Sequence, residues 1–322
     1  MSRWIDGAAV LGKVEWEYEF LRSAGLASSL RSFDEWLFRN ASSGENDSWS
    51  SGGEEPSIYA FVMQPAPGEQ ATAGVVGPSR DRAGRAYPAA IVSSLALEDA
   101  AAHPEALPIV LEEYWQTAVE ALTAVRGAPL AGDDRRLIEM TREPLAAASD
   151  ALELYVAWTQ RTTPGELCEL LDRSTSWLEH AVDALARAVR PSRDRTAASG
   201  AVRVPLGRAA GGALCFWLDV LRRAAAAPGR CPSFFWSHDA RSGDALLSLA
   251  PPLDVTLGTL WGRSATVSSA GALACDLTRA GEPSASGDLG PGSLGVGSLG
   301  PGSPGLRGGG EETLAAMLEM VG

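Results

Sequence analysis

Hydrophobic residues recur along this chain with two spacings, one typical of strands and one typical of helices. Short runs of β-branched and aromatic residues predict strands, which we place at 8–11, 57–64, 87–97, 201–206, 233–237 and 245–249. Helical spacing predicts helices, which we place between the first two strands and at 105–126, 133–148, 163–190, 213–226 and 255–261. Strands and helices that alternate in this way indicate a layered α/β domain.

The clearest helix start lies at Thr163. Its hydroxyl can cap the helix, Pro164 suits the first helical position, and Glu166 stands three residues after the cap. Apolar residues then recur at spacings of three and four as far as Pro191. This pattern predicts one amphipathic helix of several turns, whose apolar stripe we interpret as part of the core.

The chain has 35 Gly and 20 Pro, and part of this excess falls between 281 and 310, where 12 Gly, 4 Pro and 5 Ser occur. Such a composition predicts a flexible low-complexity linker. The length alone suggests about two domains at roughly 150 residues each. With the linker set apart, we predict a single α/β domain over 1–280 and a short terminal helix over 311–322. That helix docks on the domain, binds a partner or frays; the sequence leaves this open.

Acidic residues outnumber basic ones by 40 to 27, a formal charge of −13, and Lys13 is the only lysine. Proteins that neutralise nucleic-acid phosphates need clustered Lys and Arg, so this charge disfavours that class. No basic leader precedes an apolar stretch, and no apolar run approaches the roughly 18 residues that span a bilayer. We therefore predict a cytoplasmic protein that neither binds nucleic acid nor inserts into a membrane.

Motifs for catalysis or metal binding are incomplete in this chain. The segment Gly7 to Lys13 has the spacing of a phosphate loop, but Val14 replaces the hydroxyl residue that would hold magnesium. Four cysteines lack any C-x-x-C pair, and the histidines are isolated: Cys168, Cys215, Cys231 and Cys275, with His103, His180 and His238. We predict no catalytic residue, metal or cofactor. The alternative is a nucleotide-binding or hydrolytic enzyme that uses Lys13 or the loop with Ser79 and Asp81.

Residues 78–88 form the most unusual stretch, because three Arg accompany one Asp within an acidic chain. Asp81 can accept hydrogen bonds from loop amides, or from Arg82 or Arg85. One interpretation is a site for an anion or a partner protein. The other is a salt-bridged loop that ties two strands together.

Four ordered segments resemble the TagF family, also called ImpM, which is associated with bacterial type VI secretion. They are Gly12-Lys13, the 33–37 segment Phe-Asp-Glu-Trp-Leu, the 56–61 segment and the long 74–88 signature. A later aromatic strand of the family resembles 233–236, which ends at Trp236. Two positions depart from the family pattern: its Gly-Asp-Phe reads Tyr18-Glu19-Phe20, and its Trp-Arg reads Tyr59-Ala60. The signature residues in register are Gly74, Val75, Pro78, Ser79, Asp81, Gly84, Arg85 and Pro88.

This resemblance implies a three-layer α/β/α sandwich and a noncatalytic accessory protein that restrains type VI secretion after translation. In some systems the restraint involves a forkhead-associated scaffold protein, which is the partner we expect. We predict that the contact surface contains Ser79, Arg80, Asp81, Arg82, Arg85, Tyr87 and Trp36, because Arg and aromatic residues dominate binding hot spots. The residues assigned to the structural motif are Gly12, Lys13, Asp34, Gly74, Pro78, Gly84, Pro88 and Trp236.

Overall fold

A computed structural model describes residues 5–22, 28–41, 58–64, 70–129, 148–189, 201–208, 210–225, 231–237, 243–248, 260, 275–278 and 313–321. Within this part nine strands form one sheet, in the order β2-β1-β5-β4-β3-β7-β8-β6-β9. All neighbouring pairs are antiparallel except β6 and β9. The strands are β1 (Ile5–Gly12), β2 (Leu21–Arg22), β3 (Tyr59–Met63), β4 (Ala71–Gly77), β5 (Ala89–Leu95), β6 (Val202–Pro205), β7 (Ser233–Ser237), β8 (Asp244–Ser248) and β9 (Cys275–Asp276).

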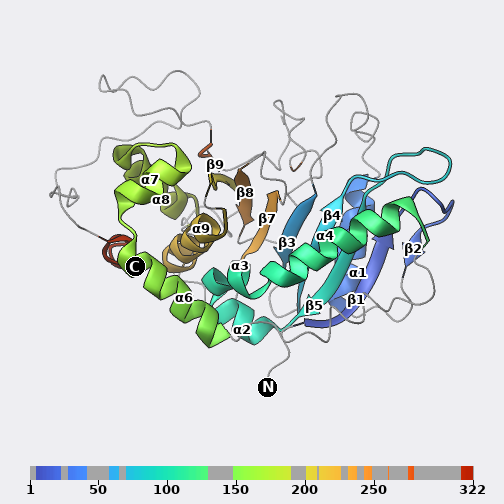
Figure 1. Ribbon diagram of the computed structural model, residues 1–322, viewed down its shortest axis with the longest axis horizontal. Coiled ribbons are helices and arrows are strands. Elements are labelled where there is room, and N and C mark those ends of the chain that lie inside the picture. The colour runs from blue at the N-terminus through green and yellow to red at the C-terminus, as the bar shows by residue number, and fades with distance from the viewer. Residues whose placement is uncertain are drawn as a thin grey trace, which may run out of the picture.

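Helices accompany this sheet, and Figure 1 shows α4 lying across its strands while several others gather near α9. The helices are α1 (Ser28–Ala41), α2 (Leu97–Ala102), the 3-10 helix η2 (Pro104–Ala106), α3 (Leu107–Val110), α4 (Glu112–Gly127), α6 (Ala148–Arg161), α7 (Pro164–Leu171), α8 (Thr175–Val189), α9 (Ala210–Ala225) and α11 (Leu314–Glu319). No helix of the described residues is long and apolar enough to cross a bilayer.

Alternation along β3 sends its side chains into two separate hydrophobic clusters, as the period of two in a strand requires. Phe61 packs in one cluster with residues of α1, while Ala60 and Val62 pack in the other with residues of α4 and α9. Helices therefore bury both kinds of strand position, and the predicted α/β class is confirmed.

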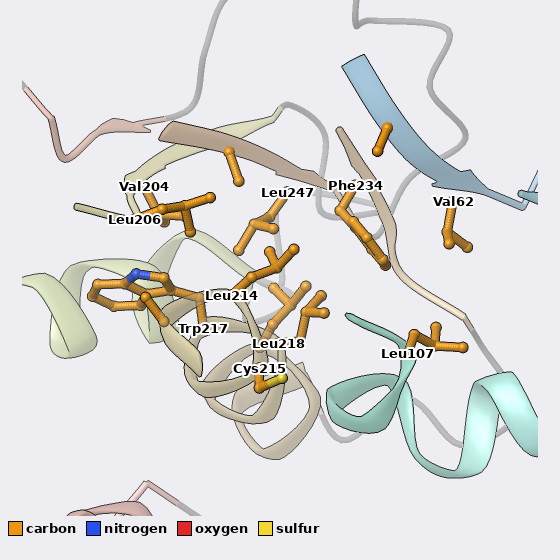
Figure 2. Close-up of a cluster of buried hydrophobic side chains, with 14 of the residues drawn as sticks. Val62, Leu107, Val204, Leu206, Leu214, Cys215, Trp217, Leu218, Phe234 and Leu247 are labelled. Carbon is orange, nitrogen blue, oxygen red and sulfur yellow. The ribbon is translucent and has the colours of Figure 1, made fainter. Parts of the chain in front are cut away.

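The larger cluster is centred on α9, and Figure 2 shows side chains of this helix pointing toward those of the sheet. Leu214, Trp217 and Leu218 come from α9, and Phe234 and Leu247 come from β7 and β8. The indole Nε1 of Trp217 donates to the carbonyl of Pro205 at 2.8 Å, so its polar atom is paired within the core. This packing holds the second half of the chain against the sheet.

Strand β4 is a central strand that the hydrophobic pattern did not predict. It pairs with both β3 and β5, yet four of its seven residues are Ala or Gly and a fifth is Thr. A Cβ on Gly74 would lie 2.2 Å from the carbonyl oxygen of Ile91 and 3.0 Å from the Phe61 ring. Close approach of its neighbours thus requires small residues here, and these remove the usual strand signal.

The helix predicted over 163–190 is two helices, and that prediction was wrong in its continuity. The start is confirmed, because Thr163 Oγ1 accepts from the Glu166 amide and Glu166 Oε2 accepts from the Thr163 amide. Asp172 then adopts a left-handed conformation with φ of 56°, which ends α7. The Ser174 hydroxyl accepts from the Trp177 amide at the start of α8.

Other differences concern short or weakly patterned elements. The predicted helix 105–126 is divided among η2, α3 and α4, and the sequence pattern did not predict α6, β2 or β9. Three predictions lie outside the described residues in whole or nearly so: helix 133–148, helix 255–261 and the linker 281–310. The short helix predicted at 311–322 forms as α11.

Gly12 marks the point where β1 leaves the sheet, and we expect Gly12→Ala to destabilise the protein. Its φ is +103°, and a Cβ there would lie 2.1 Å from the carbonyl oxygen of Pro88. The loss should be about 1–3 kcal/mol in the free energy of unfolding, measured by urea denaturation. Gly211→Ala is the control, because no atom lies within 4 Å of a Cβ there. A Gly12→Ala protein of wild-type stability would contradict this account.

Candidate partner-binding surface

Residues 78–88 connect β4 to β5 and fold back on themselves. Arg80 and Ala86 form an isolated antiparallel bridge, and the Tyr87 amide donates to the Ser79 carbonyl at 3.0 Å. At the tip, the Gly84 amide donates to the Asp81 carbonyl at 2.8 Å, and Gly84 has a φ of +81° that favours glycine. The loop is therefore held by backbone hydrogen bonds on both arms.

The Asp81 carboxylate organises the inside of this loop. Its Oδ1 accepts from the amides of Ala83 and Arg85, at 3.0 and 2.9 Å. Its Oδ2 accepts from Arg85 Nε at 2.6 Å and from Lys13 Nζ at 2.8 Å. The bonds to loop amides and to Arg85 confirm the sequence prediction, whereas the ion pair with Lys13 was not predicted. Lys13 follows β1 directly, so this pair joins the first strand to the loop.

The charged state of Asp81 is strongly favoured. Burial alone would raise its pKa, but hydrogen bonds from Lys13 and Arg85 outweigh burial and lower the pKa to about 2. The carboxylate is thus ionised at neutral pH and bound to two cations. Neither it nor the Lys13 ammonium is free to meet a ligand.

The same geometry bears on the phosphate-loop spacing from Gly7 to Lys13. Both glycines lie within β1, whereas a phosphate loop needs a strand before the first glycine and a helix after the lysine. Lys13 Nζ is bound to Asp81, and the Ser79 hydroxyl is buried without a hydrogen-bond partner in the described part of the chain. These two side chains do not form an open reactive site.

Three large aromatic side chains lie exposed beside the loop: Tyr18, Phe20 and Phe38 are 50%, 41% and 49% exposed. The Phe20 and Phe38 rings are 6.3 Å apart, and Arg82 lies over the Tyr18 ring at 5.1 Å. Arg85 is exposed too, and its Nη2 donates to the Tyr18 carbonyl at 3.5 Å. We call Tyr18, Phe20, Phe38, Arg82 and Arg85 the aromatic–arginine surface.

Buried groups hold this surface in place. The Phe20 ring meets the Tyr87 ring edge-on at 4.6 Å, and Lys13 Nζ lies 4.7 Å from the centre of the Phe20 ring. The Arg82 amide donates to the Glu17 carbonyl at 3.0 Å. The ion pair below and the aromatic residues above are therefore parts of one packed arrangement.

The predicted contact residues divide into exposed and buried groups. Arg80, Arg82 and Arg85 are exposed on the loop, whereas Ser79 and Asp81 are buried beneath it. Buried side chains cannot meet a docking partner directly, so Ser79 and Asp81 act on the surface only through the loop they hold.

Trp36 and Tyr87 are corrected from contact residues to core residues. Trp36 is 2% exposed, and its ring packs against those of Phe33 and Phe235 on the α1 side of the sheet. Tyr87 is buried under Phe20, and this burial, followed by the nearby Asp34 charge, raises its pKa. Helical spacing turns the Trp36 position inward, and the large hydrophobic side chain that α1 exposes is Phe38.

The motif residues mostly surround the ends of strands. Asp34 of α1 forms an ion pair with Arg22 of β2 at 2.5 Å, which attaches the helix to the edge strand. Trp236 of β7 packs against Trp115 of α4, with ring centres 5.4 Å apart. The remaining motif residues lie in β4, where β1 ends, or in the loop: Gly74, Gly12, Lys13, Pro78, Gly84 and Pro88.

Sequence reasoning did not assign the three exposed aromatic residues. Tyr18 and Phe20 alternate with Glu15, Glu17 and Glu19, and Val14 and Trp16 continue the same period of two. Such alternation is typical of a strand with one buried face, so it gave no signal that these aromatic rings are exposed.

Residues 9–136 match a family model described as the TagF N-terminal domain, type VI secretion system-associated. Among the solved structures that match is the crystal structure of PA0076 from Pseudomonas aeruginosa PAO1, which is 23% identical to this chain. That match covers 44% of this chain and 64% of the length of the other, with a TM-score of 0.32. No curated protein matches the chain. The aromatic–arginine surface lies wholly within the residues that the family model matches.

Proposed function

We propose that this chain, whose residues 9–136 match the TagF N-terminal domain, is a type VI secretion system-associated protein of the TagF family and acts as a noncatalytic regulatory protein. It binds a cytoplasmic component of the secretion system, for which a forkhead-associated scaffold protein is our candidate. While bound, that component cannot assemble or signal, so secretion is restrained after translation.

The exposed aromatic–arginine surface is the observation that supports this proposal. Aromatic residues and Arg are enriched at binding hot spots, because they combine a large apolar area with directed polar groups. Here Phe20 and Phe38 offer neighbouring rings, and Arg82 and Arg85 flank them with exposed guanidinium groups. Such a surface suits a partner that inserts an apolar side chain and carries acidic groups around it.

Rigidity beneath the surface favours binding over chemistry. Binding to a surface that is already ordered avoids part of the entropic cost of association. The Asp81 carboxylate accepts three hydrogen bonds from the loop and a fourth from Lys13, which follows β1 directly. Groups that would serve an enzyme are thus used to hold the loop that presents Arg82 and Arg85.

Phe38→Ala and Arg82→Ala should each weaken partner binding about tenfold or more, as hot-spot residues do. Both side chains are exposed and lie outside the Asp81 ion-pair network, so thermal stability should stay near that of the wild type. The measurement is affinity purification of tagged full-length protein from its native cell, with quantitative mass spectrometry of type VI components. Arg187→Ala, which removes a half-exposed side chain of α8 outside the aromatic–arginine surface, is the control and should bind normally.

The outcomes separate the surface from the function. If wild-type protein recovers a type VI component and both variants recover it equally well, the component binds elsewhere and the surface assignment is wrong. If wild-type protein recovers no type VI component at all, the proposed regulatory role fails.

A further inference from the structure

The helix α11 presents one apolar face to the rest of the protein. Leu314, Met317 and Leu318 are buried, and their spacing of three and four residues places them on the same side of the helix. Thr313 caps the start, since its hydroxyl accepts from the Ala316 amide. The helix has six residues, which is too short to be stable without this contact.

Two hydrogen bonds and the apolar face attach α11 to other helices. The Leu314 amide donates to the Thr162 carbonyl just after α6, at 2.9 Å. At the other end, Arg223 Nη1 of α9 donates to the Leu318 carbonyl at 3.4 Å. Figure 1 shows α11, in red, beside the end of α6. We call this contact region of α6 and α9 the α11 docking site.

The cation of the docking site is held by groups other than α11. Arg223 Nε donates to Asp219 Oδ1 at 2.9 Å, and Asp219 is buried. Its Oδ2 accepts from the Tyr155 hydroxyl at 3.1 Å, and Arg222 Nη2 donates to Oδ1 at 2.6 Å. Arg223 is therefore positioned to meet the carboxyl end of a helix before any helix arrives, where a cation suits the helix dipole.

We propose that the α11 docking site is a helix-binding site, and that α11 occupies it as an internal inhibitor. The occupant that displaces α11 is an amphipathic helix of a partner protein with Leu or Met at positions i, i+3 and i+4. This chemistry is the one that α11 itself presents, and reading such anchors from one helix face is a common mode of peptide recognition. Since α11 belongs to the same chain, it competes as an intramolecular ligand. The site is separate from the aromatic–arginine surface and goes beyond the function proposed above.

A fluorescent peptide with the sequence of residues 311–322 tests the proposal directly. In the full-length variant Leu314→Asp/Leu318→Asp the internal helix cannot dock, so the peptide should bind at least tenfold more tightly than to wild-type protein. Occupancy by α11 lowers the apparent affinity of the wild type by the fraction of molecules whose site is open. The control peptide carries the same two substitutions and should not bind either protein. A folded variant that fails to bind the unmodified peptide would overturn the proposal.

Hydrogen exchange of the wild-type protein provides a test that needs no variant. An exchangeable helix opens without unfolding the domain, so amides of α11 should exchange at least a hundredfold faster than those of α9. Equal protection of both helices would show that α11 is a fixed part of the core, and so would global unfolding of the double variant. A wild-type dimer that the double variant loses would assign the site to α11 of a second copy and overturn the assignment to a partner protein.

Discussion

Asp81→Asn should lower the free energy of unfolding by about 3 kcal/mol, because it leaves a buried Lys13 ammonium without its counter-ion. The Asp81 side chain is fully buried, and Lys13 is nearly so. Asparagine can still accept from the loop amides, but its NH₂ group cannot accept from Lys13 or Arg85. Arg85 stays hydrated because its side chain is 64% exposed. The expected loss of stability is therefore at the lower end of the range for breaking a buried ion pair. Urea denaturation at neutral pH measures it.

An exposed ion pair with the same sequence spacing as Asp81 and Arg85 provides the control. Arg187 and Asp183 are also four residues apart and joined at 3.0 Å, but both side chains are about half exposed. Asp183→Asn should cost about 0.5 kcal/mol or less, as exposed helix pairs do. Equal losses in the two variants would contradict the role given to burial of Asp81 and Lys13.

The stability of the protein at acid pH should depend on the same ion pair. The pKa of Asp81 is about 2 in the folded protein and 3.8 ordinarily, so its contribution is complete above pH 3.8 and is lost as the pH falls toward 2. The stability difference between wild type and Asp81→Asn should therefore shrink across that interval. A difference that stays constant between pH 4 and pH 2 would show that protonation of Asp81 does not control it.

The sequence predicted elements wherever the local signal agreed with the tertiary environment. Strands β3 and β7 are rich in aromatic residues between turn signals, and the cap at Thr163 is complete within four residues. The pattern failed at β4, where Gly74 is required by the nearby Ile91 carbonyl rather than by its own neighbours in sequence. The order of strands in the sheet could not be predicted for the same reason, since β3 pairs with β7 across more than 160 residues.

The sequence indicated which charged residues belong to the candidate site, but not which of them are buried and which are exposed. Two interpretations of the 78–88 loop stood open, a partner site and a structural salt-bridged loop; the structure shows the salt-bridged loop, and the partner site stays a prediction. Asp81 with Lys13 carries the structural part, and that pair spans 68 residues of sequence. Arg82 and the exposed part of Arg85 are available for binding. Side-chain type alone cannot separate these roles, because an Arg whose Nε is bound to a buried carboxylate can still expose its terminal guanidinium nitrogens.

Trp36→Ala should destabilise the protein by about 3–5 kcal/mol, the cost of emptying the space of a large aromatic side chain in a packed core. Trp36 packs against Phe33 and Phe235, and those two rings each stack on Phe61 of β3. Removing the indole therefore opens a cavity between α1 and the sheet that rigid rings cannot fill. Urea denaturation followed by intrinsic fluorescence of the remaining tryptophans measures the loss.

Phe38→Ala, two residues further along α1, separates a core role from a contact role. Because the Phe38 ring is half exposed, its removal should cost less than about 1 kcal/mol while weakening partner binding. For Trp36→Ala we expect the reverse pattern: a large loss of stability, with normal binding by the fraction that remains folded. A Trp36→Ala protein that melts like the wild type but no longer binds would return Trp36 to the contact surface. The helix would then have to turn by roughly half a revolution, since positions two apart on an α-helix lie about 200° apart.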